Sequence, residues 1–159
     1  MQDVNVVVAF YSRAGTTEKK ALAAAVGAVQ GRASIRLRRI AETASQETIA
    51  GVPEWQENDE RMSKEYIAPR DADAQWAEGL LVVIPNWMSP EAPEVRTCIA
   101  GLAAGKGKVA VALGPAGLRE ALAEAGCTVF PTPEHEDDLE CARLSGVRVA
   151  EAARAARTP

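Results

Sequence analysis

The sequence has few aromatic residues, three cysteines and a single histidine. Only 4% of its 159 residues are aromatic, although 47% are hydrophobic. A chain of this length can bury a sizeable core without disulfide bonds or metals. The interior must therefore be built from alanine, valine, leucine and isoleucine. The length fits one domain of ordinary size, so we expect residues 1–159 to form a single domain.

The cysteines are widely spaced along the chain, at Cys98, Cys127 and Cys141. Their odd number argues against a disulfide framework, and the lack of a C-x-x-C pair argues against a structural zinc site. We expect all three to be free thiols that act as small apolar residues in a reducing cytosol. The sequence predicts no metal site.

Charge and the N-terminal segment exclude further classes of protein. The formal net charge is -4, and the basic residues form no evident stripe, which argues against nucleic-acid binding. The same charge is too small for the acidic surface that steers electron-transfer partners. The first apolar run, Val4 to Phe10, follows no basic segment and is too short to cross a bilayer. We interpret it as a strand, in a cytoplasmic protein without membrane contact.

Apolar segments alternate with amphipathic segments along the whole chain. Fully apolar runs are typical of strands buried on both faces of a parallel sheet, whereas residues 34–40 alternate as an edge strand does. Alternating strands and helices predict a three-layered, doubly wound α/β fold with a five-stranded parallel sheet. The predicted strands lie near residues 4–11, 34–40, 80–85, 108–113 and 127–130, and the predicted helices near 17–29, 71–78, 94–104, 118–125 and 137–156.

Two segments carry more specific expectations. In the first helix, the apolar residues include Leu22, Ala25, Val26 and Val29, at helical spacing. Residues 41–70 combine many charges with glycine and proline, and a structureless loop of that length is unusual in a compact domain. We expect this segment to be partly helical and to cover a site or form the interface of a homo-oligomer.

A polar turn separates the first strand from the first helix. Ser12, Thr16 and Thr17 offer hydroxyl groups, and Gly15 allows the backbone to approach a ligand closely. The helix that follows presents unpaired N–H groups and a partial positive charge, so this turn is typical of a phosphate site. Arg13 either adds a charged contact or is solvated. The alternative is that Thr16 or Thr17 only caps the helix and Gly15 only shapes the turn.

The run YSRAGTT at residues 11–17 resembles the phosphate loop of flavodoxin-like proteins. It is similar in particular to NAD(P)H:quinone oxidoreductases of the tryptophan-repressor-binding-protein type and their flavin reductase relatives. Residues 81–88 resemble the strand and loop that contact the flavin ring there, and DLECARLSG at residues 138–146 resembles the last helix. The resemblance implies a flavodoxin-like fold, FMN as cofactor, and NAD(P)H and a quinone as substrates. The cofactor-binding residues that it implies are Ser12, Arg13, Gly15, Thr16, Thr17, Asn86, Trp87, Met88, Gly114 and Gly117.

The second and third loops differ from the usual pattern of that family. The second loop reads IPNWMS at residues 84–89, and its Trp87 either stacks on an isoalloxazine ring or covers the end of the sheet. The third loop, LGPAG at residues 113–117, is short, and Pro115 has no N–H to donate. These loops leave a second function open, in which a flavodoxin-like binding or regulatory module no longer holds a flavin.

The sequence nominates no catalytic side chain. His135 is the single histidine, and it stands among acidic residues at the start of the last predicted helix. A general base is one interpretation, but a solvated residue at a helix start is the more common situation. One histidine also defines no catalytic triad. In the enzyme hypothesis the flavin performs the chemistry and the chain positions it.

Overall fold

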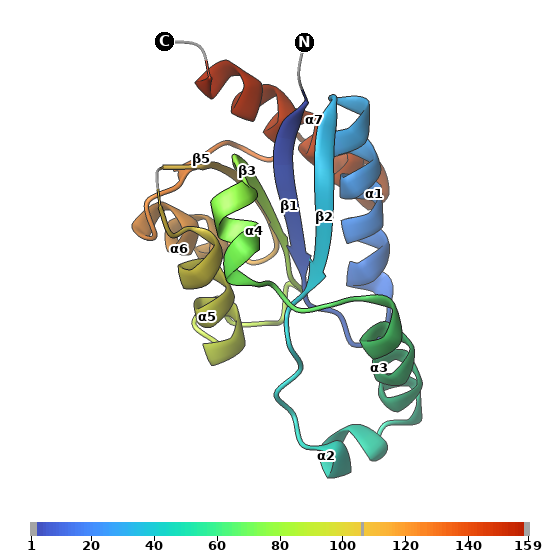
Figure 1. Ribbon diagram of the computed structural model, residues 1–159. Coiled ribbons are helices and arrows are strands. Elements are labelled where there is room, and N and C mark those ends of the chain that lie inside the picture. Colours follow the sequence, from blue (N-terminus) through green and yellow to red (C-terminus); the bar gives the residue numbers. More distant parts are fainter. Residues whose placement is uncertain (1–2, 106, 158–159) are drawn as a thin grey trace.

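The computed structural model describes residues 3–105 and 107–157. In this part of the chain, five strands form one sheet in the order β2-β1-β3-β4-β5, and all neighbouring strands run parallel. Helices flank both faces of the sheet (Figure 1). This order is that of the flavodoxin type of doubly wound fold, so the predicted fold class is confirmed.

The elements follow the predicted sequence with small shifts at their ends. Residues 41–70 are partly helical, as expected, and contain α2 and α3. The strands are β1 (Val4–Phe10), β2 (Ala33–Arg39), β3 (Gly79–Val83), β4 (Val109–Leu113) and β5 (Thr128–Val129). The helices are α1 (Thr16–Gln30), α2 (Gln46–Ala50), α3 (Pro53–Glu65), α4 (Asp71–Trp76), α5 (Pro93–Leu102), α6 (Gly117–Glu124) and α7 (Asp138–Ala156).

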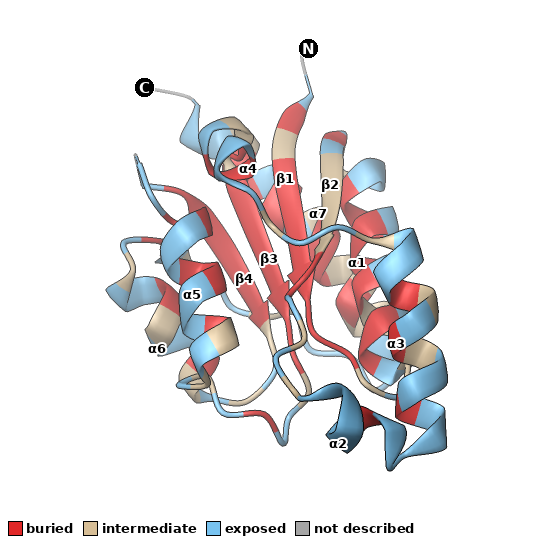
Figure 2. Ribbon diagram, turned by 60° about the horizontal axis from the view of Figure 1, so that its bottom comes forward, coloured by how far each residue is buried: buried red, intermediate tan, exposed pale blue. Residues whose placement is uncertain are grey.

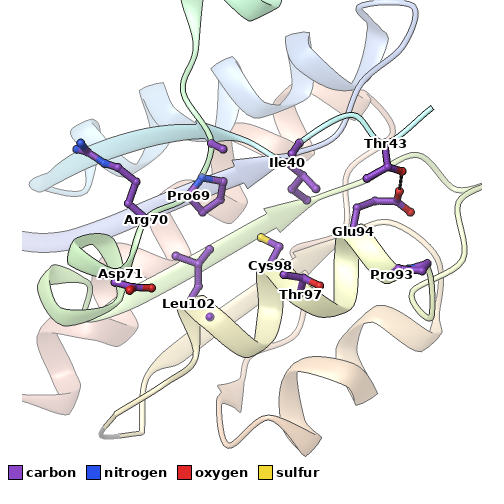
Figure 3. Close-up of a pocket in the computed structure, with 13 residues that line it drawn as sticks. Ile40, Thr43, Pro69, Arg70, Asp71, Pro93, Glu94, Thr97, Cys98 and Leu102 are labelled. Atoms are coloured by element: carbon purple, nitrogen blue, oxygen red, sulfur yellow. Dashed lines mark hydrogen bonds between the residues drawn. The ribbon is translucent and has the colours of Figure 1, made fainter. Parts of the chain in front are cut away.

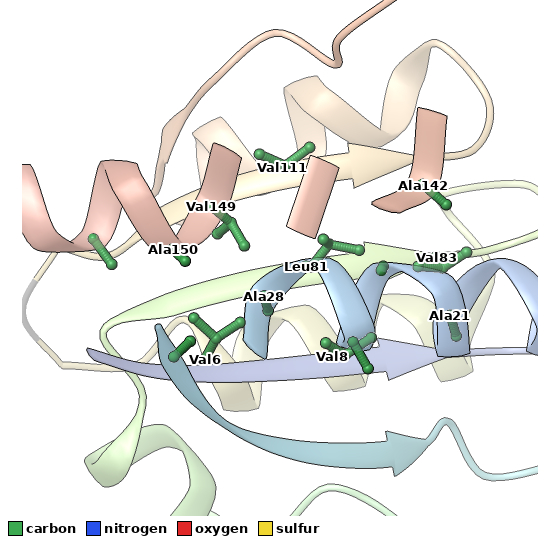
Figure 4. Close-up of a cluster of buried hydrophobic side chains, with 14 of the residues drawn as sticks. Val6, Val8, Ala21, Ala28, Leu81, Val83, Val111, Ala142, Val149 and Ala150 are labelled. Atoms are coloured by element: carbon green, nitrogen blue, oxygen red, sulfur yellow. The ribbon is translucent and has the colours of Figure 1, made fainter. Parts of the chain in front are cut away.

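Strand β1 shows how the sheet is buried on both faces. Val6 and Val8 pack into the cluster beneath α1 and α7 (Figure 4), whereas Val7 and Ala9 pack into the cluster beneath α5 and α6. The central strands are buried along their length, and β2 at the edge is only partly buried (Figure 2). Helices α2 and α3 lie beyond the carboxyl ends of β1 and β2 (Figure 1). They are therefore at the end of the sheet where ligands bind in folds of this type.

The buried face of α1 is made of alanine rather than of its larger residues. Ala21, Ala24 and Ala28 are fully buried, whereas Leu22 is 42% exposed and Val26 and Val29 are still more exposed. The reason is the close crossing of α1 with α7, which small residues allow. A Cβ on Gly27 would lie 1.8 Å from the carbonyl oxygen of Arg143, and one on Gly146 would lie 1.9 Å from that of Ala24.

A buried carboxylate ties the edge strand to the segment that leads into β3. Asp73 of α4 accepts from Arg38 Nε at 2.8 Å and from Arg36 Nη1 at 3.1 Å, and its side chain is fully buried. It also accepts from the backbone N–H of Arg70 at 2.8 Å. Burial alone would raise the pKa of Asp73, but these hydrogen bonds outweigh it and lower the pKa to about 2. Arg36 and Arg38 of β2 thus share Asp73 as a structural partner.

The thiols agree with the expectation from their spacing. Cys98, Cys127 and Cys141 are free; the first two are buried and the third is partly buried. In the part of the chain that the structure describes, no helix is long and apolar enough to cross a membrane.

The thiols are expected to differ in reactivity. Burial raises the pKa of Cys98 to about 12, so this thiol is protonated at neutral pH and poorly nucleophilic. We expect iodoacetamide at pH 8 to modify Cys141 first and Cys98 only after unfolding, as read by peptide mass spectrometry. The intact mass of untreated protein should match three free thiols, and a mass that indicates an intramolecular bridge would contradict the assignment.

Candidate functional site

The turn after β1 is built around the hydroxyl of Ser12. Its Oγ accepts hydrogen bonds from the N–H groups of Gly15 and Glu18, both at 3.2 Å, and the side chain is 1% exposed. Gly15 has a φ of 89°, in the left-handed region that favours glycine, and α1 begins at the next residue. Ser12 therefore caps the start of α1. The alternative, in which Thr16 or Thr17 caps this helix, is wrong.

Above this turn the backbone offers donors to a ligand. In the described part of the chain, the N–H groups of Thr16 and Thr17 donate to no protein acceptor, as is usual in the first turn of a helix. A Cβ built on Gly15 would meet only Asn58 Oδ1, at 3.9 Å, so the space over the glycine is open. The turn thus combines free N–H groups, a helix N-terminus and room for an anion.

Glu18 is the acidic residue nearest this helix start, and its charge is offset. Arg61 of α3 contacts it through Nη2 at 2.5 Å, and the hydroxyl of Tyr66 donates to it at 2.5 Å. The hydrogen bond from Arg61 holds the pKa of Glu18 below its usual range. Glu18 therefore stays ionised and paired with Arg61, which reduces its repulsion of an anion at the turn.

Arg13 lies over the faces of aromatic rings from three segments. Its guanidinium carbon is 4.0 Å from the ring centroid of Trp55 in α3 and 4.6 Å from that of Trp87 in the loop after β3. It is 5.5 Å from the ring centroid of Tyr11, and its Nε donates to the Tyr11 hydroxyl at 2.7 Å. We call Tyr11, Trp55 and Trp87 the aromatic cluster.

Glu42 joins two members of the aromatic cluster. The Tyr11 hydroxyl donates to Glu42 Oε2 at 2.7 Å, and Trp55 Nε1 donates to the same oxygen at 3.3 Å. The other oxygen accepts from the N–H of Ala44 at 3.1 Å. Burial, with the hydrogen bond to Glu42, raises the pKa of Tyr11 well above its usual range. The phenol therefore keeps its proton at neutral pH and acts as a fixed link between Glu42 and Arg13.

The predicted residues of the second loop lie in different environments. Asn86 is exposed and Trp87 is 61% exposed, so both are available to a ligand. Met88 is 6% exposed and belongs to the core cluster under α5 and α6. Contact of all three residues with a flavin ring remains a prediction, and Trp87 presents the largest free surface for it.

The glycines predicted in the third loop pack against the second loop. A Cβ on Gly114 would lie 2.9 Å from Ile84 Cγ1, so glycine is required for this close approach. Gly117 is the first residue of α6, and a Cβ there would lie 3.3 Å from Pro90 Cγ. The loop between β4 and α6 is thus short, and Pro115 gives it no N–H to donate.

Trp55 and Glu42 are the site residues that the sequence reasoning missed. Both belong to residues 41–70, for which a site-covering role was expected without naming a side chain. Trp55 lies near the start of α3, where Pro53 is the first helical residue. An isolated tryptophan at the start of a charged helix was the signal that could have nominated it.

His135 does not join this site in the way that a general base would. It is exposed, and its Nδ1 accepts from the backbone N–H of Asp137 at 3.0 Å. Asp137 in turn caps α7 by accepting from Leu139 and Glu140. This is the helix-start role that the sequence suggested. Among the described residues, no group of three or more histidine, cysteine, aspartate or glutamate side chains is arranged to hold a metal ion.

A separate hollow of about 380 Å³ lies between residues 40–43, residues 68–71 and α5 (Figure 3). Ile40, Cys98 and Leu102 line it, and Glu94 hydrogen bonds to Thr43 at its side. None of its described lining residues belongs to the turn at residues 12–17 or to the aromatic cluster. It is therefore distinct from the site that the sequence predicted.

The hydroxyl of Ser12 gives a direct test of the turn. Ser12→Ala removes the acceptor of two N–H groups, so we expect it to lower the free energy of unfolding by about 1–2 kcal/mol in urea denaturation. Thr16→Ala removes an exposed hydroxyl next to the same turn and should change stability by less than about 0.5 kcal/mol. Equal stabilities of the two variants would contradict the capping role of Ser12.

Comparison with known proteins agrees with this fold. No model of a known protein family matches the sequence. The NAD(P)H dehydrogenase (quinone) of Deinococcus radiodurans is 32% identical over 96 residues, which are 60% of this chain and 48% of that protein. The aligned part thus spans about half the length of this curated relative.

Solved structures show the same architecture. A flavodoxin from the domain Archaea has a TM-score of 0.60 at 17% identity and covers 95% of this chain and 99% of its own. The flavodoxin-like domain of a Synechococcus protein has a TM-score of 0.57 at 14% identity, and Flavodoxin 2 from Bacillus cereus one of 0.52 at 18%; each covers 94% of this chain and 99% of its own. The fold is flavodoxin-like, and the resemblance seen at residues 11–17 is confirmed at the level of the fold.

Proposed function

We propose that the protein binds flavin mononucleotide, with the phosphate at the turn of residues 12–17 and the ring against Trp87. One observation carries this proposal. Arg13 extends from the phosphate-type turn to the exposed ring of Trp87, so an anion site and an aromatic face lie within the reach of one side chain. Both follow the carboxyl ends of neighbouring strands, β1 and β3, where ligands bind in sheets of this type.

The residues present fit flavin mononucleotide at the phosphate and on one side of the ring. The N–H groups of Thr16 and Thr17, the open space over Gly15 and the charge of Arg13 suit a phosphate. The exposed ring of Trp87 suits stacking on a planar heterocycle. The loop after β4 contributes close packing through Gly114 rather than a row of donors.

We further propose an activity of the NAD(P)H:quinone oxidoreductase type. The likeness to the Deinococcus radiodurans NAD(P)H dehydrogenase (quinone) supports it. When bound, flavin mononucleotide supplies the electron-transfer chemistry. The side chains of the turn and of the aromatic cluster would hold and orient the flavin mononucleotide. Tyr11 keeps its proton throughout. No side chain needs to act as an acid or a base.

A binding or regulatory module is the second candidate function. The short loop after β4 favours it, because Pro115 removes a donor and Gly117 is already part of α6. Steady-state oxidation of NADH or NADPH with a quinone acceptor separates the two functions. Turnover that depends on added FMN supports the oxidoreductase, whereas the absence of both FMN binding and turnover supports the module that no longer holds a flavin.

Trp87 gives the matched test of where the ring lies. We expect Trp87→Ala to weaken FMN binding by about 1–3 kcal/mol, the typical contribution of stacking a base on an aromatic side chain. Trp76→Ala is the control, because Trp76 lies in α4 beneath Arg36 and outside the aromatic cluster. Titration monitored by flavin fluorescence should show a loss of affinity only for Trp87→Ala. Unchanged affinity of this variant would refute the stacking position.

A further inference from the structure

Arg13 lies over one face of Trp87, the ring on which the flavin is proposed to stack, and over the ring of Trp55. We propose that Arg13 is a built-in occupant of the ring site: it lies over Trp55 and Trp87 in the free protein and turns to the phosphate when a flavin ring stacks in its place. This inference rests on the proposed function. It makes Arg13 the residue that selects phosphorylated over unphosphorylated flavins, and it adds Trp55 as a second aromatic wall of the ring site.

The guanidinium of Arg13 contacts the rings of Trp55 and Trp87. The guanidinium lies over the rings of Trp55 and Trp87 at 4.0 and 4.6 Å from their centroids, within the range of favourable cation–π interaction. A guanidinium is planar and stacks on aromatic faces, as a flavin ring also does. The two groups therefore compete for the same surface. A ring tethered to a phosphate at residues 12–17 would approach Trp87 on the side of the turn, which is the side that Arg13 occupies.

Among the residues that the structure describes, the charge of Arg13 has no acidic partner. In the described part of the chain its side chain forms no salt bridge, and its one hydrogen bond is donated to the neutral hydroxyl of Tyr11. Glu42 is reached only through that hydroxyl. By contrast, Arg38, Arg39 and Arg61 are each paired with a carboxylate. Arg13 is thus a half-buried cation that an arriving anion can recruit.

Arg13 is itself part of the turn that is proposed to bind the phosphate. Arg13 directly follows Ser12, and the free N–H groups of Thr16 and Thr17 are in the same turn. A rotation of one side chain therefore moves the guanidinium from the rings toward an anion at the turn. A ligand with both a ring and a phosphate displaces Arg13 from the rings but gives it a new contact with the phosphate. A ring without a phosphate displaces Arg13 and gives it no new contact.

The variant Arg13→Ala is expected to change the binding of lumiflavin and the preference for FMN in different ways. Arg13→Ala uncovers the rings, so lumiflavin, which has the ring alone, should bind about 5- to 30-fold more tightly than to the wild type, as expected for the loss of two competing cation–π contacts. The same variant loses the charged contact to the phosphate, so the preference for FMN over lumiflavin should fall at least about tenfold. Arg13→Lys is the matched control, because it keeps the charge and should retain most of the preference for FMN.

Titrations of both flavins against the three proteins therefore decide the inference. Lumiflavin affinity that rises, together with a reduced FMN preference, supports it. Lumiflavin affinity that is unchanged or lower in Arg13→Ala would overturn it, because the rings would then not have been covered by Arg13.

A second measurement does not depend on flavin. In a Trp76→Phe background, all tryptophan emission comes from Trp55 and Trp87. Arg13→Ala should change this emission, and millimolar methylguanidinium should restore it by refilling the place of the side chain. If neither flavin binds but methylguanidinium restores the emission, flavin binding and the displacement of Arg13 by a flavin ring are both refuted. The position of the Arg13 guanidinium over the two rings is then still supported. Without restoration, the guanidinium site itself is refuted.

Discussion

Replacing Gly146 with leucine is expected to destabilise the protein by about 3 kcal/mol or more. A Cβ at this position would lie 1.9 Å from the carbonyl oxygen of Ala24 and 2.6 Å from the N–H nitrogen of Ala28. Both are backbone atoms of α1, so no flexible side chain can move aside. The helices must separate, and α1 and α7 lose the packing that covers one face of the sheet.

A second glycine provides the matched control for this experiment. Gly101 lies in α5, is exposed, and a Cβ there would have no neighbour within 4 Å. Gly101→Ala should therefore stabilise the protein by about 0.5–1 kcal/mol, the usual gain for alanine over glycine in a helix. Urea denaturation followed by circular dichroism measures both changes. A Gly146→Leu variant as stable as the wild type would show that the two helices do not cross so closely.

Removing the carboxylate of Asp73 should cost about 3–5 kcal/mol, because it leaves a buried arginine without its partner. The side chain of Arg38 is only 12% exposed, and its Nε and Nη2 both donate to Asp73. Arg36 and the N–H of Arg70 lose the same acceptor. Asp71→Ala is the control, since Asp71 is exposed at the start of the same helix and should change stability by about 0.5 kcal/mol or less. Equal stabilities of the two variants would contradict the role of Asp73.

The pH dependence of the free energy of unfolding is an independent test of the interaction between Asp73 and Arg38. The pKa of Asp73 in the folded protein is about 2, below the 3.8 of an unperturbed aspartate. The unfolded chain therefore binds the proton more readily, and the stabilisation is complete above about pH 4 and is lost as the pH falls toward 2. We expect Asp73→Ala to lose less stability than the wild type over this interval. Parallel curves would contradict the lowered pKa.

The fold could be predicted because its signals are local. Apolar runs such as Val4 to Phe10 are strongly β-forming, and their alternation with helices leaves few topologies open. The buried face of α1 could not be predicted in the same way. Leu22, Val26 and Val29 form the stronger apolar pattern, but the contact of Gly27 with Arg143 decides which face turns inward. That contact joins residues far apart in the sequence, so no local pattern contains it.

The candidate site likewise has a part that could be predicted from the sequence and a part that could not. The turn at residues 12–17 was predictable, since its residues are consecutive and follow a buried strand. The assembly of Trp55 from α3, Glu42 from the chain after β2 and Trp87 from the loop after β3 was not, because only the fold brings them to Arg13. Sequence also gave no reason to expect Arg13 over aromatic rings, since an arginine in such a turn is equally compatible with full solvation.

We propose that this chain holds flavin mononucleotide by its phosphate at residues 12–17. The most direct measurement is calorimetric titration of the purified protein with FMN and, in parallel, with riboflavin, which has the same ring and ribityl chain but no phosphate. We expect FMN to bind at least about tenfold more tightly than riboflavin, because charged hydrogen bonds to the phosphate contribute about 1.5–3 kcal/mol. Equal affinities for the two flavins, or no binding of FMN at saturating concentration, would contradict it.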